Sequence, residues 1–178
     1  EWPDFSGVEN ATAMFYGALF TTDFWALDFS SVTNASYMLA YTTYAVPVDW
    51  VDLPLATNGD YMFEGANVSV DLSNFNLPSL TTVDYMFRNS TISGLLTNWD
   101  LTSLTDGTRM FGSYNQYQNG ANVNASLAGL DLSGITNATH MFNRVDFNID
   151  LMTEWPDFSG VENATAMFYG ALFTTDFW

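Results

Sequence analysis

Methionine recurs along this chain at almost constant intervals, and this periodicity limits the folds that the chain can adopt. Seven of the eight methionines follow one another at steps of 24, 24, 24, 24, 31 and 26, and phenylalanine follows each of the seven except Met38. The positions nine and six residues before them are apolar, and the position three before is Ala or Gly in six cases of seven. We number repeats 1 to 7 by these residues, which are Met14, Met38, Met62, Met86, Met110, Met141 and Met167.

A single repeat of this length is too short to bury its own apolar positions. Stacked repeats bury them against one another, so the period predicts a mainly β solenoid of about seven stacked coils of 24–31 residues, one domain over 1–178. Alternating apolar residues favour a short strand in each coil, near WALDFS at 25–30 and WVDLPL at 50–55. The three-residue spacing in VTNASYM at 32–38 favours a tight helical turn or an arc.

The step from Met110 to Met141 contains about seven additional residues. The segment SYNQYQNGANVNAS at 113–126 is polar and rich in Asn, and insertions in solenoids form surface loops. We therefore expect an exposed loop over 113–126.

The segment 1–25 is identical to 154–178, at an offset of 153. Two explanations fit this identity. The chain is a window of a longer array whose unit corresponds to 1–153, or it closes with a cap that resembles its start. Caps normally depart from the repeat and carry a polar outer face, whereas both of these strips are ordinary repeats. We favour the array, and we expect Glu1 to reflect processing or excision from a longer chain.

The composition excludes several classes of partner. The chain has twenty acidic residues against three arginines and no lysine, and its net charge is −17. Binding to nucleic acid requires basic residues, and an anionic membrane surface repels such a chain. No apolar run reaches the roughly 18–20 residues of a membrane helix, so we expect no membrane insertion. The remaining candidates are cations, glycans and the protein itself. With no cysteine, the compartment cannot be inferred from disulfides.

Three segments resemble a known repeat, namely SVTNASYML at 31–39, WDLTSLTDGTRMF at 99–111 and LDLSGITNATHMF at 130–142. They are similar to the Trp-Asp…Val-x-Asn…Met-Phe repeat of the BspA-like leucine-rich-repeat surface proteins. The resemblance implies a leucine-rich-repeat-like β-solenoid that is extracellular or displayed on the cell surface, used in adhesion or as a scaffold, and without catalytic residues. The chain departs from that repeat in lacking its cysteine and its first methionine.

Seven Asn-x-Ser/Thr sequons are candidates for N-glycosylation in a secreted protein. Those nearest the methionines, four residues before them, equally suit side-chain capping of a turn, because Asn accepts backbone N–H bonds there. The other three follow Met-Phe or lie in the insertion, and they are the better glycan candidates. The first group is Asn10, Asn34, Asn137 and Asn163, and the second is Asn67, Asn89 and Asn124.

An aspartate recurs ten residues before most of the methionines. At a stacking distance of about 4.8 Å, neighbouring carboxylates repel by about 0.9 kcal/mol even in bulk water. Backbone N–H donors at a turn can offset this repulsion, and calcium bridging is the functional alternative. The candidate calcium ligands are Asp4, Asp28, Asp52, Asp100, Asp131 and Asp157. A parallel row of threonines five residues before the methionines favours hydrogen bonding along the stack.

No catalytic signature occurs in the sequence. His140 is the only histidine, which with no cysteine argues against zinc, and there is no P-loop or dinucleotide glycine motif. We therefore expect no enzyme but a structural repeat segment of an extracellular fibre or surface stalk, acidic, glycosylated and self-associating end to end. The alternative is an adhesin-type module that binds a host protein or glycan through one face, with 113–126 as its irregular feature.

Overall fold

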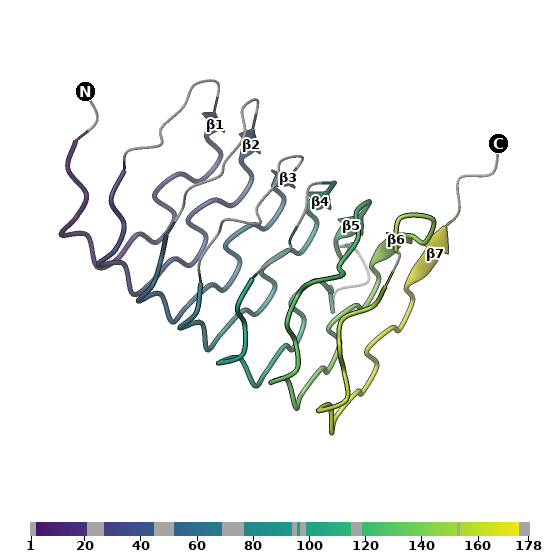
Figure 1. Cartoon of the computed structure of the whole chain (residues 1–178). Helices are drawn as coiled ribbons and strands as arrows, with labels where there is room; N and C mark the ends of the chain where they lie inside the picture. The colour runs from purple at the N-terminus through teal and green to yellow at the C-terminus, as the bar shows by residue number, and fades with distance from the viewer. Residues whose placement is uncertain are drawn as a thin grey trace.

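The computed structural model describes residues 3–20, 27–44, 52–68, 77–93, 96, 99–114, 119–152 and 154–174. Its regular elements are all short strands, and the described ranges contain no helix. Successive turns of the chain lie side by side from one end of the molecule to the other, with the two termini at opposite ends (Figure 1). This arrangement is consistent with the solenoid predicted from the methionine period.

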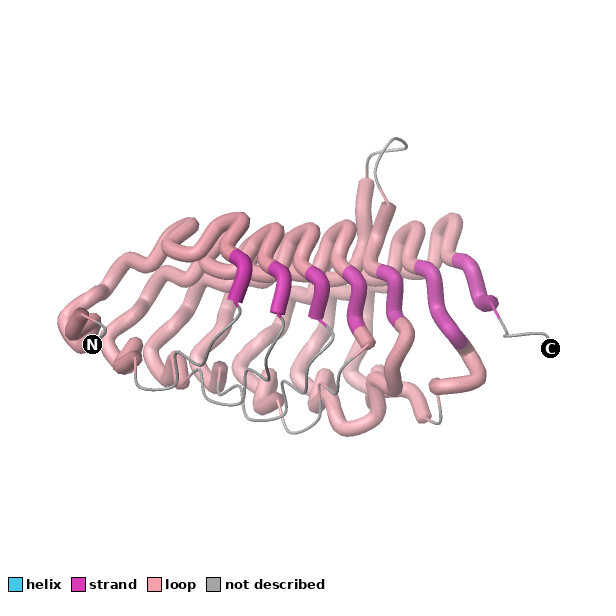
Figure 2. The backbone as a smooth tube through the Cα atoms, turned by 90° about the horizontal axis from the view of Figure 1, so that it is seen from above, coloured by secondary structure: helices cyan, strands magenta, loops and turns pink. Residues whose placement is uncertain are grey.

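One parallel sheet runs the length of the molecule in the order β1-β2-β3-β4-β5-β6-β7. Figure 2 shows its strands in a single row. Each strand pairs with the equivalent residues of the next repeat, as Leu19 does with Thr43 and Asn67 with Thr91. The strands are β1 (Leu19–Phe20), β2 (Thr43–Tyr44), β3 (Asn67–Val68), β4 (Thr91–Ile92), β5 (Asn122–Val123), β6 (Asp146–Asn148) and β7 (Leu172–Thr174).

Each repeat contains a strand, but among the described residues it does not lie at the predicted positions; residues 25–26 and 50–51 lie outside the described residues, and Asp52 is a single bridge residue. The strands begin five residues after the methionine in repeats 1 to 4, whereas 27–30 and 53–55 lie in turns and loops. Residues such as Leu27, Phe29 and Leu53 are buried all the same. Their apolar spacing reflects an irregular arc against the core, which a period-two pattern imitates.

The segment around each methionine forms consecutive tight turns instead of a helix. In repeat 2 the N–H groups of Met38 and Ala40 donate to the carbonyl oxygens of Ala35 and Tyr37, three residues back. The N–H groups that alternate with these donate to the next repeat, as Leu39 does to the carbonyl of Met62. Backbone donors therefore alternate between closing a turn and joining two repeats, which satisfies them without a helix.

This alternation holds ten non-glycine residues at positive φ, between 51° and 59°. They lie one residue before and three residues after the methionines, as Tyr37 and Tyr41 do in repeat 2. A left-handed conformation costs roughly 1–2 kcal/mol for a residue with a Cβ. The N–H of Tyr37 donates to the carbonyl of Asp60 in the next repeat, so the strained residue also supplies an inter-repeat bond.

The core consists of side-chain ladders, each built from one position of the repeat. Phe63, Phe87, Phe111 and Phe142 are all fully buried, and their neighbouring rings stack at centroid distances of 5.0–5.2 Å. The small residues three before the methionine face this core as well. A Cβ on Gly107 would lie 2.1 Å from Cε of Met141, so the methionine side chain packs directly over this position.

The exposed loop predicted over 113–126 is shorter than expected, because its last part enters the sheet. The pairing of Thr91 with Asn122 shows that the additional residues lie between Met110 and β5. Asn122 and Val123 belong to the sheet, although the sequence placed them in a loop over 113–126; residues 115–118 lie outside the described residues. A Cβ on Gly112 would lie 2.2 Å from the carbonyl oxygen of His140, so glycine is required where the insertion leaves the stack.

The phenylalanine ladder gives a stability prediction with a built-in control. Phe87→Ala removes a fully buried ring between two others and should lower the free energy of unfolding by about 3–5 kcal/mol. Phe168→Ala, in the same ladder but 39 % exposed, should cost less than half as much. Urea denaturation followed by tyrosine and tryptophan fluorescence measures both, and equal losses would contradict a continuous buried ladder.

Candidate functional site

The asparagines four residues before the methionines cap turns. The side-chain Oδ1 of Asn10 accepts the N–H of Thr12 at 3.0 Å, and the same bond recurs at Asn34, Asn58, Asp106, Asn137 and Asn163 at 2.9–3.1 Å. In the sequons of Asn10, Asn137 and Asn163 the hydroxyl of the threonine also donates to the same oxygen. The capping explanation is confirmed for these residues, and the bonds leave their glycosylation untested.

The other three sequons lie on the surface. Asn67 begins β3, Asn89 has a φ of 57° three residues after Met86, and Asn124 directly follows β5. All three are exposed. Oδ1 of Asn124 accepts a hydrogen bond from Nδ2 of Asn148 in the next repeat at 2.8 Å. Their position makes them sterically accessible for a glycan, and their modification remains a prediction.

Backbone donors satisfy the aspartates that the sequence suggested as calcium ligands. The carboxylates of Asp4, Asp28, Asp100, Asp131 and Asp157 each accept the N–H two residues later, at 2.8–3.1 Å. This backbone bond lowers the pKa of the Asp4 carboxyl below its ordinary value of 3.8. No group of three or more acidic, histidine or cysteine side chains that could hold a metal occurs in the described part of the chain, which includes the sixth candidate, Asp52.

The predicted hydrogen bonding of the threonine row along the stack is confirmed at Thr33, Thr57, Thr81 and Thr136. The Thr33 hydroxyl donates to the carbonyl of Glu9, and Thr57 and Thr81 each donate to the threonine one repeat earlier, at 3.1–3.3 Å. Thr136 donates to Thr105 in the same way across the longer step. These bonds run along the stack and reinforce the backbone bonds between the same residues.

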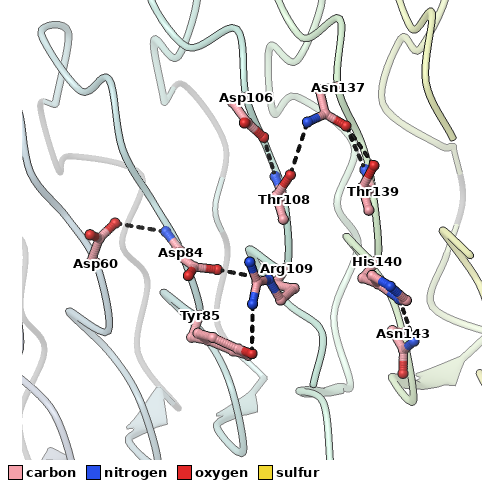
Figure 3. Close-up of polar contacts among 10 residues, drawn as sticks. All are labelled: Asp60, Asp84, Tyr85, Asp106, Thr108, Arg109, Asn137, Thr139, His140 and Asn143. Atoms are coloured by element: carbon pink, nitrogen blue, oxygen red, sulfur yellow. Dashed lines mark hydrogen bonds and ion pairs between the residues drawn. The ribbon is translucent and has the colours of Figure 1, made fainter. Parts of the chain in front are cut away.

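The capping ladder is interrupted in the middle of the molecule. Repeat 4 has Thr82 where the neighbouring repeats have Asn or Asp, and the N–H of Asp84 donates instead to Oδ1 of Asp60, one repeat earlier, at 2.8 Å (Figure 3). Asp84 itself stands in a column that is otherwise Ser or Thr except for Asp60. The sequence analysis did not single out these two aspartates, although their departure from that column was visible in it.

Asp84 and Arg109 line a cavity of about 320 Å³ beside this interruption. Oδ1 of Asp84 lies 3.2 Å from Nε of Arg109, and Nη1 of Arg109 donates to the Tyr85 hydroxyl at 3.0 Å (Figure 3). Burial raises the pKa of the Asp84 carboxyl above its ordinary value of 3.8; Arg109 opposes this rise, while the charges of Asp60 and Asp106 add to it. The cavity is thus lined by acidic and hydroxyl side chains and by one cationic side chain, that of Arg109.

Tyrosines and cations share the outer face of the turns. Tyr37, Tyr61 and Tyr85 stack on one another at ring-centroid distances of 4.5 and 5.2 Å, and burial raises the pKa of Tyr61 from 10.0 to about 12. Arg88 lies 4.6 Å from the Tyr85 ring centroid and pairs with Glu64, which is only 3 % exposed. We name this face the ridge, and it is made of Tyr37, Tyr61, Tyr85, Arg88, Arg109, His140 and Arg144.

The ridge therefore contains every arginine and the only histidine of a chain whose net charge is −17. At its far end His140 accepts a hydrogen bond at Nδ1 from Nδ2 of Asn143, at 2.7 Å (Figure 3). The sequence analysis considered His140 only as the single histidine of the chain and as an argument against zinc. The clustering was not evident, because Arg88, Arg109 and Arg144 occupy different positions of the repeat and only the turns bring them to one face.

The comparisons with known proteins assign a family. The chain belongs to the family described as "Mycoplasma protein of unknown function, DUF285", which matches residues 1–94 and 57–177. No curated protein and no solved structure matches the chain. The described residues also include no helix long and apolar enough to cross a membrane.

The opposite pKa directions of two aspartates give a pH prediction. The raised pKa of Asp84 means that its contribution to stability is complete below pH 3.8 and is lost as the pH rises through the raised value. The melting temperature of Asp84→Asn minus that of the wild type should therefore be largest at pH 7. The lowered pKa of Asp4 gives a contribution to stability that is present above pH 3.8 and is lost on acidification. The melting temperature of Asp4→Asn minus that of the wild type should therefore be smallest at pH 7. Calorimetry between pH 3 and 7 should show that these two melting-temperature differences change with pH in opposite directions. Parallel changes would contradict the opposite pKa directions of Asp84 and Asp4.

Proposed function

We propose that this chain is a structural repeat segment of an extracellular fibre or surface stalk, built as a leucine-rich-repeat-like solenoid of about seven coils, one for each repeat. Its role is mechanical and involves no reaction. The repeats bury one continuous column of apolar side chains, and the acidic, hydroxyl-rich exterior keeps the fibre soluble and resistant to proteolysis. The resemblance to BspA-like surface proteins supports the extracellular location.

The observation that carries the proposal is the identity of residues 1–25 and 154–178 within one regular stack. The N–H groups of Ala13 and Phe15 donate to repeat 2, whereas the same groups of Ala166 and Phe168 have no backbone acceptor among the described residues. The carbonyls of Thr12 and Met14 likewise have no described backbone donor. The two end repeats thus offer complementary backbone groups, which favours continuation by further repeats.

Apolar exposure at the last repeat supports the same proposal. Phe168, Leu172 and Phe173 are 39 %, 59 % and 50 % exposed, while Phe20, the counterpart of Phe173 in the identical first strip, is 7 % exposed. A further repeat would cover the end of repeat 7 just as repeat 2 covers repeat 1. Within an array, residues 154–178 would begin a new unit equivalent to 1–153.

Electron microscopy of the native material tests this proposal. We expect filaments with an axial repeat of about 29 Å, which corresponds to six coils at about 4.8 Å each. For the 178-residue chain at high concentration, Phe173→Asp should abolish end-to-end association measured by sedimentation velocity and lower the monomer's melting temperature by less than the same change at a buried position, because Phe173 is 50 % exposed.

The matched control is Phe20→Asp, which makes the same change in an identical strip. It should destabilise the monomer by at least about 3 kcal/mol, because it places a charge at a buried position. A wild-type chain that stays monomeric, together with native material that lacks filaments, would refute the proposed function.

The exposed sequons give a separate prediction about glycosylation of the native protein. We expect glycans on Asn67, Asn89 and Asn124, and lower occupancy of Asn137, whose Nδ2 donates to the Thr108 hydroxyl at 3.1 Å. Peptide mapping with and without glycosidase measures the occupancy at each site. Unmodified Asn89 and Asn124 in the native material would rule out this prediction.

The ridge favours one alternative function, an adhesin-type module that recognises a host protein or glycan. Tyrosine and arginine are the residues that dominate binding energy in recognition surfaces, and here they gather on one face. The exposed Tyr114, where the insertion leaves the stack, contacts His140 edge-on at 5.5 Å, so the insertion extends the ridge. This alternative is compatible with a fibre that displays binding sites along its length.

A further inference from the structure

A hollow of about 280 Å³ opens at the far end of the ridge, between repeats 5, 6 and 7. It is distinct from the acidic cavity at Asp84, because none of its described lining residues is a carboxylate. The lining residues are Tyr114, His140, Asn143, Arg144, Ala166 and Tyr169.

Small residues of the last strip create this hollow. The position before the methionine carries a tyrosine in repeats 2 to 4, but in repeat 7 it carries Ala166, beside His140. Gly170 stands three residues after Met167, at a φ of +68°, and a Cβ there would lie 3.4 Å from Cγ of Arg144. The stem of Arg144 therefore lies over a glycine, and Arg144 lines the space that remains.

Arg144 is the distinctive cation of the ridge. Arg88 pairs with Glu64 and Arg109 with Asp84, whereas no ion pair joins Arg144 to any of the described residues. An arginine side chain presents a planar set of donors that matches a carboxylate in a bidentate geometry. In a chain with twenty acidic residues, an arginine beside a hollow whose described lining has no carboxylate favours an anionic ligand.

The walls of the hollow favour a sugar ring. Tyr114 and Tyr169 are 69 % and 63 % exposed, and such rings combine an apolar face with a polar hydroxyl. Asn143 is 3 % exposed, and its Oδ1 has no hydrogen-bond partner among the described atoms. With Nδ2 of Asn143 donating to Nδ1 of His140, the neutral imidazole carries its proton on Nε2 and can donate it to a ligand oxygen.

We propose that this hollow binds a sugar residue that carries a carboxylate, with Arg144 on the carboxylate, the rings of Tyr114 and Tyr169 against the sugar, and His140 donating to a ring substituent. Sialic and uronic acids share this chemistry. The inference deepens the binding alternative and rests on it, and it is independent of filament formation.

The site would recur along a fibre. It requires the strip 154–178 to follow repeat 6, and the identical strip 1–25 has the same alanine and glycine, Ala13 and Gly17. In an array of such units, each junction between repeat 6 and this strip would form one site. The fibre would then bind acidic glycans multivalently, at one site per unit.

Calorimetric titration of the 178-residue chain tests the proposal with three probes. These are 3′-sialyllactose, a hyaluronan tetrasaccharide as the uronic acid source, and lactose as the neutral sugar. We expect at least one acidic sugar to bind ten-fold or more tightly than lactose, and the two acidic arms identify the source. Arg144→Gln should remove this preference, because it removes the cation and keeps hydrogen-bonding capacity.

Ala166→Tyr supplies the decisive variant, because the same backbone position holds tyrosine at φ 55–58° in repeats 2 to 4. It should fill the hollow and reduce binding at least ten-fold. Ala13→Tyr makes the same change in the identical strip of repeat 1 and should bind like the wild type. Unimpaired binding by a folded Ala166→Tyr variant, equal affinity for lactose, or no binding of either acidic sugar would overturn the proposal. Filaments that form normally while sugar binding fails would overturn this inference and leave the structural function intact.

Discussion

The backbone hydrogen bonds between repeats are the constraint on which this structure depends. In repeats 1 to 6, N–H groups near the methionine that close a turn in their own repeat alternate with N–H groups that donate to the next repeat, as Leu39 does to Met62. The strands extend the same connection, but each is only two or three residues long. Because the turns hold residues at positive φ that would be strained alone, a single repeat has little stability. Stability comes from the stack.

This dependence explains how a chain with a net charge of −17 forms one continuous core. The side chains that recur at the surface bind the backbone: Asp and Asn accept N–H groups two residues later, and Thr donates to the carbonyl of the preceding repeat. Carboxylates stacked one above another would otherwise repel. The backbone bond lowers the pKa of Asp4, whereas Asp84, at the interruption of this pattern, has a raised pKa.

Several departures from the repeat lie on one face. Thr82, Asp84 and the arginines break their columns on or beside the ridge, and the glycine-flanked insertion leaves the stack next to them. A column facing the core admits little change, because each side chain packs against equivalents in both neighbouring repeats. On the ridge the tyrosines of repeats 2 to 4 stack in the same way, but repeats 5 to 7 carry Arg109, His140 and Ala166 at that position, so this surface column tolerates changes without loss of the stack.

The sequence alone determined the period, the mainly β stack and the buried methionine and phenylalanine columns, because each of these follows from residues that repeat at fixed spacing. For Asn10 and its counterparts it left turn capping and glycosylation open, and the hydrogen bonds of the folded chain showed the capping. It did not determine where the strands lie, because a core-facing arc and a strand share the same apolar pattern over a few residues. Nor did it indicate that Arg144, His140 and Ala166 meet at one hollow. His140 and Ala166 share the position before the methionine in successive repeats, but Arg144 stands three residues after Met141, and only the turns of the folded chain bring it to the same hollow.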